Sequence, residues 1–430
     1  MTERKRLLQL ALPAMAENIL QMLMGMVDTY LVAQISLITV SGVSVANNIL
    51  TIYQAVFIAL GASAASLIAK SLGQKDSRQT ERLIWDTLVM TLVLSGILGI
   101  FSILCGRWLL ALLGTELTVS QTGGLYLAIV GGGIGFLGLM TTLGSILRAK
   151  GKPNLSMKVS LIANILNAII SALAVFVFHW GMVGVAAATV FSRLVGCLIL
   201  WRALALDVKS VTLTRPFNKD LCSLVLPAAG ERLMMRAGDV VIVAIIVRFG
   251  TEVVAGNAIG ETLTQFNYMP GMGVATATVI SIAHSLGSGD FQTTQRLARE
   301  AYWLSLWMML PIGLLTFAFG GGLTHLYTDN SGAVAASMVV LLYSFIGTPV
   351  TAGTLVYTAV WQGLGQAKLP FYATTFGMWV IRIFLGYILG ISFNLGLAGV
   401  WIATVVDNLF RTIFLYIRYK LFFKNDLFQS

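Results

Sequence analysis

Long apolar runs separated by short polar connections cover almost the whole chain of 430 residues. A helix that crosses the hydrocarbon core of a bilayer needs about 20 predominantly apolar residues. The pattern predicts about twelve such helices, so we expect an all-α integral membrane protein. The predicted spans are roughly 7–34, 41–71, 85–106, 119–147, 157–179, 182–204, 221–248, 253–286, 299–321, 334–364, 370–392 and 397–418.

The second half of the chain repeats the first at an offset of 214 to 215 residues. The matching positions are Pro13 with Pro227, Glu17 with Glu231, Ser71–Asp76 with Ser285–Asp290, and Gly181–Val190 with Gly396–Val405. Six helices per copy let both copies enter the membrane in the same direction, as parallel repeats related by a pseudo-two-fold axis along the membrane normal. We therefore predict an N-terminal lobe over 1–205, a cytoplasmic linker over 206–219 and a C-terminal lobe over 220–430.

The composition agrees with a membrane protein and changes how the positive charge is interpreted. Hydrophobic residues make up 57% of the chain and charged residues only 11%, against about 25% charged in soluble proteins. The net charge of +10 would suggest a nucleic-acid partner, but 21 of the 28 Lys and Arg residues fall in connections on one side of the predicted membrane. The opposite side holds only Arg107 and Arg248. By the positive-inside rule, we expect both termini in the cytoplasm, a location in the cell (inner) membrane and no nucleic-acid partner.

The other residue types do not indicate metal or cofactor chemistry. The three cysteines and three histidines are scattered and form no Cys-x-x-Cys pattern, so we expect neither a disulfide framework nor a metal site. The sequence has no P-loop, which argues against an ATP-driven pump. We expect no enzymatic activity and no cofactor.

Eleven charged residues fall within the predicted spans, where each needs a partner, a proton or a water-filled cavity. They are the bases Arg193, Arg232, Arg236, Arg382 and Arg411 and the acids Glu17, Asp28, Glu231, Asp239, Glu261 and Asp407. Asp239 lies three residues after Arg236, and Arg411 lies four residues after Asp407. Because residues at these spacings share a helix face, the sequence predicts two structural ion pairs.

Asp28 differs from the other acids because no basic residue lies within a helical turn of it. It lies about 10 Å beyond the midpoint of the first predicted helix, towards the outside. Glu17 precedes it by eleven residues, close to three turns, so the two carboxylates should share one face. An unpaired carboxylate at this depth should be able to hold a proton at neutral pH, as a proton-coupled carrier requires. The alternative is a protonated side chain that only bonds a neighbouring helix.

Three further acids are candidates for a substrate-binding site or a second coupling site. Glu17 and Glu231 are repeat-mates, and Glu231 lies one turn after Pro227. Glu261 follows Gly260 in the eighth predicted helix. A purely structural role is the alternative for all three.

The ordered motifs of the chain resemble those of the multidrug and toxic compound extrusion (MATE) transporters of the MOP superfamily. The motifs are Val27-Asp28-Thr29, Leu72-Gly73, Leu286-Gly287, Gly184–Thr189 and Gly399–Thr404, and with them the resemblance covers essentially the whole chain. It implies a V-shaped molecule of two six-helix lobes. It also implies export of cationic, amphipathic compounds in exchange for inward-moving H⁺ or Na⁺.

The resemblance implies a coupling-ion site in the N-terminal lobe. Asp28 matches the first-helix acid that family members use for cation coupling, and Asn167 and Thr189 fit the polar network around it. Some members carry a second acid where this chain has Ser171. A lone carboxylate favours H⁺, whereas Na⁺ at Asp28 would need the oxygens of the other three side chains.

Other members of the family carry acids in the tenth and seventh helices. An ungapped alignment places Thr351 and Met235 at those positions, and Glu231 lies one turn from Met235. Whether Glu231 replaces the seventh-helix acid is left open by this departure from the family pattern.

We predict a secondary active multidrug antiporter that acts as a monomer in the bilayer, with small cationic, amphipathic substrates and H⁺ or Na⁺ as the coupling ion. One alternative is a lipid-linked oligosaccharide flippase of the same superfamily, which the excess of acids over bases within the spans disfavours. Another is a membrane receptor or channel that binds without exchange, which the duplication disfavours.

Overall fold

The computed structural model describes residues 3–112, 115–205 and 218–426, and every regular element in these ranges is helical. The first copy contains α1 (Glu3–Ala33), α2 (Leu37–Gly73), α3 (Ser77–Leu112), α4 (Leu117–Tyr126), η1 (Leu127–Gly131), α5 (Ile134–Ala149), α6 (Pro153–Phe176) and α7 (Gly181–Leu204). The second contains α8 (Lys219–Ile246), η3 (Val247–Phe249), α9 (Thr251–Gly287), α10 (Phe291–Ala318), α11 (Gly320–His325), α12 (Ser331–Ile346), α13 (Thr348–Gly363), α14 (Lys368–Phe376), η4 (Gly377–Arg382), α15 (Ile383–Tyr387), η5 (Ile388–Ser392) and α16 (Gly396–Asp426). The predicted all-α class is confirmed, and residues 206–217 of the predicted linker lie outside the described ranges.

These helices account for the twelve predicted spans. In the described ranges, nine continuous helical segments are long and apolar enough to cross a membrane. Two more spans are bent pairs: α4–η1 with α5, at 45°, and α12 with α13, at 59°. The twelfth is α8, which has 28 residues but contains Glu231, Arg232 and Arg236 in every stretch of 18. Its charged residues, and not its length, distinguish α8 from the nine apolar helical segments.

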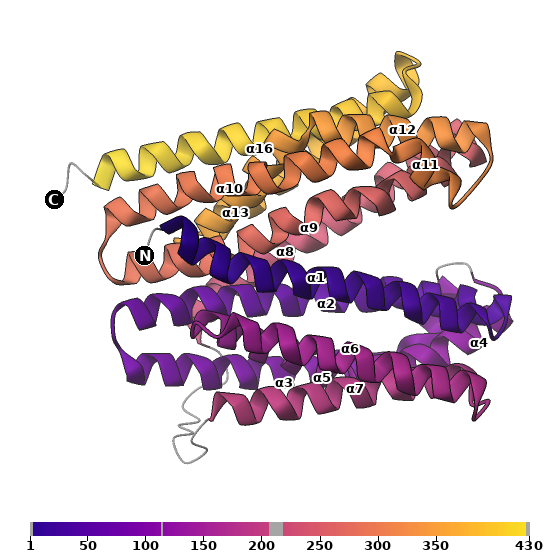
Figure 1. Ribbon diagram of the computed structural model, residues 1–430, viewed down its shortest axis with the longest axis horizontal. Helices are drawn as coiled ribbons and strands as arrows, with labels where there is room; N and C mark the ends of the chain where they lie inside the picture. The colour runs from indigo at the N-terminus through magenta and orange to yellow at the C-terminus, as the bar shows by residue number, and fades with distance from the viewer. Residues whose placement is uncertain (1–2, 113–114, 206–217, 427–430) are drawn as a thin grey trace. The chain divides into compact units, whose positions relative to one another are not determined.

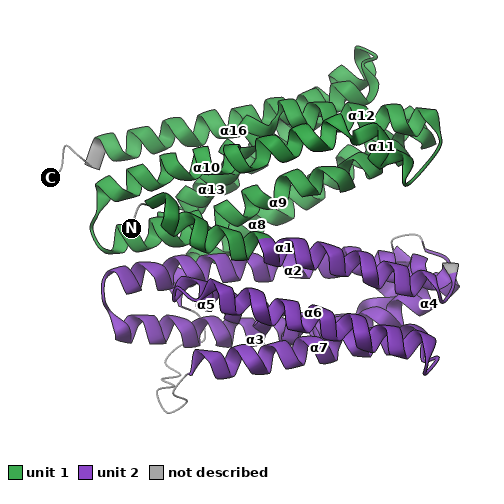
Figure 2. Ribbon diagram, in the orientation of Figure 1, with its two compact units in different colours: residues 1–15, 223–430 green, residues 16–222 purple. Residues whose placement is uncertain are grey.

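The chain forms two compact units, which Figure 2 shows in different colours. Unit 2 comprises residues 16–222, and unit 1 comprises residues 1–15 and 223–430. The first turns of α1 therefore belong with the second copy, and Gly273 of α9 lies directly against Ala11 and Met15. The predicted lobe boundaries assigned these turns to the N-terminal lobe.

Each unit is a bundle of helices with its own apolar core. In unit 2, α2, α3 and α5 lie against one another, and α6 lies beside α7 (Figure 1). Phe57 is fully buried there and lies against Gly138, where any side chain would collide with its ring. In unit 1, α9 packs against α10, α12 and α13, and α13 packs against α16. Small residues at helix contacts are typical of packing inside membranes.

The repeated motif at 71–76 and 285–290 is a helix–turn–helix connection built twice. Ser71 Oγ donates to the backbone oxygen of Asp76 (3.0 Å), and the Asp76 carboxylate accepts from the backbone N–H of Gln79 (2.9 Å). The same two bonds in unit 1 run from Ser285 to Asp290 (2.9 Å) and from Thr293 to Asp290 (2.9 Å). In both copies an Asp caps the next helix by bonding its free N–H groups.

The two turns differ at the position just before the capping Asp. The backbone there is left-handed in both copies, with φ of 59° at Lys75 and 75° at Gly289. Glycine adopts this conformation without a steric cost, whereas a lysine Cβ crowds the following carbonyl.

A one-residue insertion explains why the repeat offset changes from 214 to 215. The helix α6 of unit 2 is regular, whereas its counterpart in unit 1 contains the π-helical turns η4 and η5. A π turn accommodates an extra residue within a continuous helix. The matched motifs have an offset of 214 up to Asp290 and of 215 from Gly396 onwards, and both π turns lie within this interval.

Candidate functional site

Asp28 is held by an amide from α6 within unit 2. The Asn167 Nδ2 group donates to both oxygens of the Asp28 carboxylate, at 3.0 and 3.2 Å. Within the described residues, no Lys, Arg or His nitrogen lies within 4.0 Å of this carboxylate. The sequence predicted an acid without a partner on its own helix. The structure adds a partner from a helix 139 residues further along the chain.

The other two residues predicted for the ion site occupy different places. Ser171, one turn after Asn167 on α6, donates to the Asn167 side-chain oxygen at 3.4 Å, so it reaches Asp28 only through Asn167. Thr189 on α7 is buried and donates to the backbone oxygen of Val185 in its own helix, at 3.0 Å. The part of Thr189 in ion binding remains a prediction, because the described contacts include no hydrogen bond between Thr189 and Asp28.

Arg193 is a further charged group at this level of unit 2. Gly184 lies against Ala174 and Gly196 lies against Ala163, so α6 and α7 run in opposite directions and Arg193 is level with Asn167. Its guanidinium interacts electrostatically with Asp28 and with the buried Tyr126. The Nη1 atom is buried without a hydrogen-bond partner among the described residues.

Glu17 forms a partly buried ion pair with Arg148 of α5. The Arg148 Nη1 atom lies 2.6 Å from Glu17 Oε2, and Ser156 and Ser160 of α6 donate to the same carboxylate at 3.3 and 3.2 Å. Glu17 and Asp28 thus both face α6, as their spacing predicted. Arg148 is one of the 21 basic residues expected in the connections, just after the predicted span 119–147, and this expectation was wrong: it lies in the last turn of α5.

Glu231 occupies the corresponding place in unit 1 and has different partners. It is buried, and its carboxylate accepts from Thr374 Oγ1 at 3.1 Å and from Gln362 Nε2 at 3.4 Å. Within the described ranges, no Lys, Arg or His nitrogen lies within 4.0 Å of its oxygens.

Glu261 lies in a charged region of unit 1 around Arg382. Asn257, one turn earlier on α9, bonds the Glu261 side chain, and Arg382 interacts with Glu261 electrostatically. Arg382 also lies 3.6 Å from Asp239 and donates to Thr404 at 3.0 Å. The helix α8 thus contributes Asp239 to the same region as the candidate acid of α9.

Both ion pairs predicted from helical spacing are present. Arg411 lies 2.8 Å from the fully buried carboxylate of Asp407, and Arg236 lies 3.9 Å from Asp239. The contacts of Arg382, Arg148 and Arg193 join helices far apart in the chain and were not predicted. For Arg382 and Arg193 the sequence signal was an arginine inside an apolar run, and Arg148 had no such signal.

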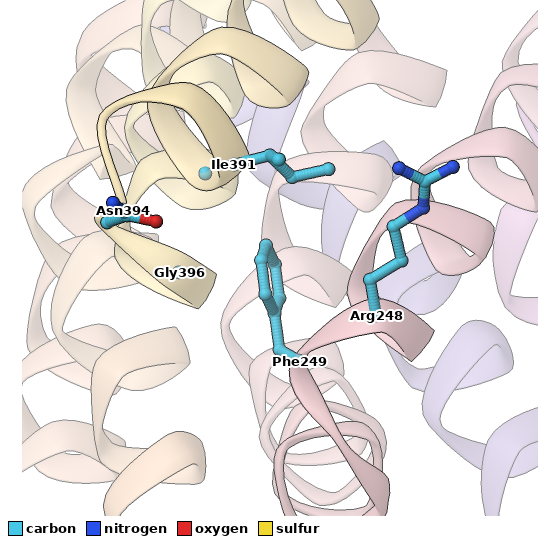
Figure 3. Close-up of a pocket in the computed structure, with 6 residues that line it drawn as sticks. Arg248, Phe249, Ile391, Asn394 and Gly396 are labelled. Carbon is cyan, nitrogen blue, oxygen red and sulfur yellow. The ribbon is translucent and has the colours of Figure 1, made fainter.

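A surface pocket of about 270 Å³ lies elsewhere in unit 1. It is lined by Arg248, Phe249, Gly390, Ile391, Asn394 and Gly396. Figure 3 shows Ile391 and Arg248 extending toward one another, with Phe249 below them. None of the predicted site residues lines it. The described residues also contain no group of three or more His, Cys, Asp or Glu side chains that could hold a metal ion.

Comparison with known proteins places the chain among membrane transporters. The family model MatE matches twice, over residues 13–173 and 227–388, which confirms the internal duplication. The chain is 27% identical over 425 residues to a Thermotoga maritima protein called "Probable multidrug resistance protein NorM", covering 95% of this chain and 90% of that protein. It is 24% identical to the Bacillus subtilis "Uncharacterized transporter YisQ", covering 96% and 93% of the two chains.

Solved structures share the fold over almost the whole chain. A crystal structure of MATE in complex with MaL6 superposes with a TM-score of 0.92 at 20% identity, covering 100% of this chain and 98% of that chain. An outward-facing multidrug resistance MATE transporter of the MOP superfamily gives 0.91 at 21% identity, covering 98% and 96%. These likenesses establish the fold, and the double match to the family model establishes the family. The chain is a multi-pass membrane protein and belongs to the MatE family of transporters.

Proposed function

We propose that this protein is a secondary active antiporter that exports cationic, amphipathic small molecules in exchange for H⁺, with Asp28 as the proton-binding group. The observation that carries the proposal is the Asp28–Asn167 contact, a carboxylate within a membrane span held by a neutral amide. A carboxylate with a neutral partner can change its protonation state, whereas one locked to an arginine cannot easily do so.

The structural effect of proton binding at Asp28 would be transmitted to α6 through the side chain of Asn167. While Asp28 is charged, one NH₂ group serves both of its oxygens. A proton turns one oxygen into a donor and a weaker acceptor, so the Asn167 amide would shift toward the other oxygen. The Asn167 oxygen accepts from Ser171 one turn further along α6, so the adjustment would reach that turn as well.

The relatives support the substrate class. Relatives at 22 to 27% identity are called multidrug resistance proteins, and expelling lipophilic cations against a gradient requires an energy source. With no ATP-binding motif in the sequence, an ion gradient is the source that we propose. The asymmetry of the Lys and Arg residues supports an orientation with both termini in the cytoplasm. We propose that the protein acts as a monomer in the cytoplasmic membrane.

The test is efflux of ethidium, a fluorescent cation, from proteoliposomes under an imposed H⁺ gradient or an imposed Na⁺ gradient. We expect the H⁺ gradient to drive efflux by the wild type, and Asp28→Asn to fall to the rate of protein-free liposomes. The matched control is Asp329→Asn, because Asp329 is fully exposed in the connection before α12. Export by Asp28→Asn at the wild-type rate would refute the assignment of Asp28, and efflux driven only by Na⁺ would refute H⁺ as the coupling ion.

A further inference from the structure

The carboxylates of Glu17 and Glu231 are each bound by a hydroxyl and a side-chain nitrogen in the same arrangement, one in each unit. We call these two sets of donors cradles. In each cradle Oε1 accepts from a hydroxyl: Ser160 at 3.2 Å in unit 2 and Thr374 at 3.1 Å in unit 1. In each cradle Oε2 accepts from a nitrogen that lies 131 residues further along the chain, and the hydroxyl lies 143 residues further along. Identical spacings mean that the duplication itself produced both cradles.

The nitrogen donor is where the two cradles differ. In unit 2 it is the guanidinium of Arg148, at 2.6 Å, and in unit 1 it is the amide of Gln362, at 3.4 Å. Arg148 is held by Ser145 (2.9 Å) and Ser156 (3.1 Å). The positions of these serines in the second copy, at the offset of 214, are Ala359 and Pro370. The cradle of Glu231 therefore lacks both the arginine and the two hydroxyls that support it in the cradle of Glu17.

The change decides which protonation states each carboxyl group can adopt. Arg148 carries a permanent positive charge, so a protonated Glu17 would leave that charge without its partner. A glutamine amide carries both a carbonyl oxygen and an NH₂ group. Because the Gln362 amide is neutral, protonation of Glu231 leaves no uncompensated charge on its partner. The first cradle fits only the charged form, and the second fits both.

Two arginines lie near Glu231 without forming an ion pair with it. Arg232 follows it on α8 and also interacts with Tyr268 of α9, and Arg411 of α16 acts on it from further away. Arg411 is already paired with Asp407 at 2.8 Å. Adjacent residues on a helix point about 100° apart, so Arg232 cannot replace the missing Arg148 in the cradle.

We propose that Glu231 is a second proton-binding site of the transport cycle, and that glutamine at position 362 enables it to take up and release a proton. A proton from water adds to one carboxylate oxygen of Glu231, and the same proton returns to water later in the cycle. Glu231 is only 8% exposed in this structure, so the exchange belongs to a conformation in which water reaches the cradle. Glu17, locked by Arg148, stays charged throughout. The inference rests on the proposed proton-coupled export.

Reciprocal exchange of the two donors tests the inference. Gln362→Arg should lock Glu231 in its charged form, and Arg148→Gln should free Glu17. Infrared difference spectra after a pH step report the carbonyl stretch of protonated carboxyl groups. We expect one such band to disappear in Gln362→Arg and in Glu231→Gln, and a new one to appear in Arg148→Gln. The matched control is Gln366→Arg, which adds the same charge at an exposed position of the turn after α13 and should leave the bands unchanged.

Ethidium-induced proton release, measured with a pH indicator on the purified protein, separates this inference from the role of Asp28. With two sites, the wild type should release about two protons per transporter, and Glu231→Gln and Asp28→Asn should each release about one. Full release by Glu231→Gln together with no release by Asp28→Asn would overturn the second site and leave Asp28 standing. The absence of release from the wild type would overturn both proposals. If Glu231→Gln does not fold, unchanged carboxyl bands in Gln362→Arg would refute the inference by themselves.

Discussion

The helix α6 and its counterpart α14–η5 are the same repeat element with different chemistry. In its second turn each element carries a hydroxyl that donates to a glutamate of another helix: Ser160 to Glu17 and Thr374 to Glu231. Beyond that point α6 continues as a regular helix and presents the amide of Asn167 to Asp28. Its counterpart enters a π turn and presents the guanidinium of Arg382 to Asp239.

This divergence coincides with the change of repeat offset. Ser160 and Thr374 are 214 residues apart, whereas Asn167 and Arg382 are 215 apart. The π turn begins at Gly377, which lies directly against Asp407 and Arg411, where a larger residue would collide. Unit 1 thus surrounds this bend with ion pairs, whereas the matching stretch of α6 in unit 2 binds Asp28 through a neutral amide.

The largest effect is expected from removing the cation of the buried pair beside the π turn. Arg411→Leu leaves the fully buried Asp407 without a counter-charge, which should lower the free energy of unfolding by about 3–5 kcal/mol. Thermal unfolding in detergent measures the loss. Arg82→Leu removes another i,i+4 Arg–Asp pair, the one with Asp86, whose arginine is exposed, and should cost less than about 1 kcal/mol. Equal losses in the two variants would show that burial does not distinguish these pairs.

A smaller loss is expected from removing Arg382, the last residue of the π turn η4. Arg382→Gln removes the partner of Asp239 at 3.6 Å and the donor to Thr404. Asp239 keeps Arg236, so the free energy of unfolding should fall by about 1.5–3 kcal/mol, the range for a hydrogen bond to a charged group. The double variant Arg382→Gln/Asp239→Asn should recover part of the loss, because no unpaired charge is left. If the double variant were less stable than the single one, the two side chains would not be partners.

The corresponding change in α6 should affect transport more than stability. Asn167→Ala removes both bonds to Asp28, and a loss of about 1.4 kcal/mol would slow ethidium efflux about tenfold. Ser171→Ala removes only the longer bond, 3.4 Å, to Asn167, and should slow efflux about twofold. Initial rates in proteoliposomes, corrected for reconstituted protein, measure both. A larger effect from Ser171→Ala than from Asn167→Ala would contradict the order of contacts around Asp28.

The two copies of the helix–turn–helix connection at 71–76 and 285–290 should respond in opposite directions. Lys75→Gly relieves a left-handed residue and should stabilise the protein by about 1 kcal/mol, whereas Gly289→Lys should destabilise it by a similar amount. Thermal unfolding of both variants beside the wild type gives the two shifts. Shifts of the same sign would mean that these backbone angles do not control the stability of the turns.

The smallest expected effect is a pH dependence of local stability at the turn of unit 1 that contains Asp290. Hydrogen bonds from the Thr293 side chain and backbone hold the pKa of Asp290 below its usual range. Because the folded-state pKa is lowered, the stabilisation is present above the ordinary Asp pKa of about 4 and is lost as the pH falls through the lowered value. Amide hydrogen exchange in the first turn of α10 should lose protection over that window. In Asp290→Asn, which cannot titrate, protection should not depend on pH there.

Much of the candidate site was predictable because its residues sit at helical spacings. Asp407 with Arg411, and Arg236 with Asp239, lie on the same helix, so their pairing follows from 3.6 residues per turn. The resemblance to a known family identified Asn167 as a neighbour of Asp28. Partners such as Arg148 for Glu17 were not found, because 131 residues separate them and no local pattern encodes which helices meet.

The sequence by itself determined the membrane class, the twelve spans, the duplication and its change of offset, because apolar length and repeated motifs are properties of the chain alone. Only the tertiary structure decided the state of each buried charge. A carboxylate inside the membrane is defined by what faces it across a helix contact: an amide for Asp28, a guanidinium for Glu17, and a glutamine with a threonine for Glu231. In a medium of low dielectric constant the cost of a charge depends on atoms within a few ångströms, and helix packing sets those distances.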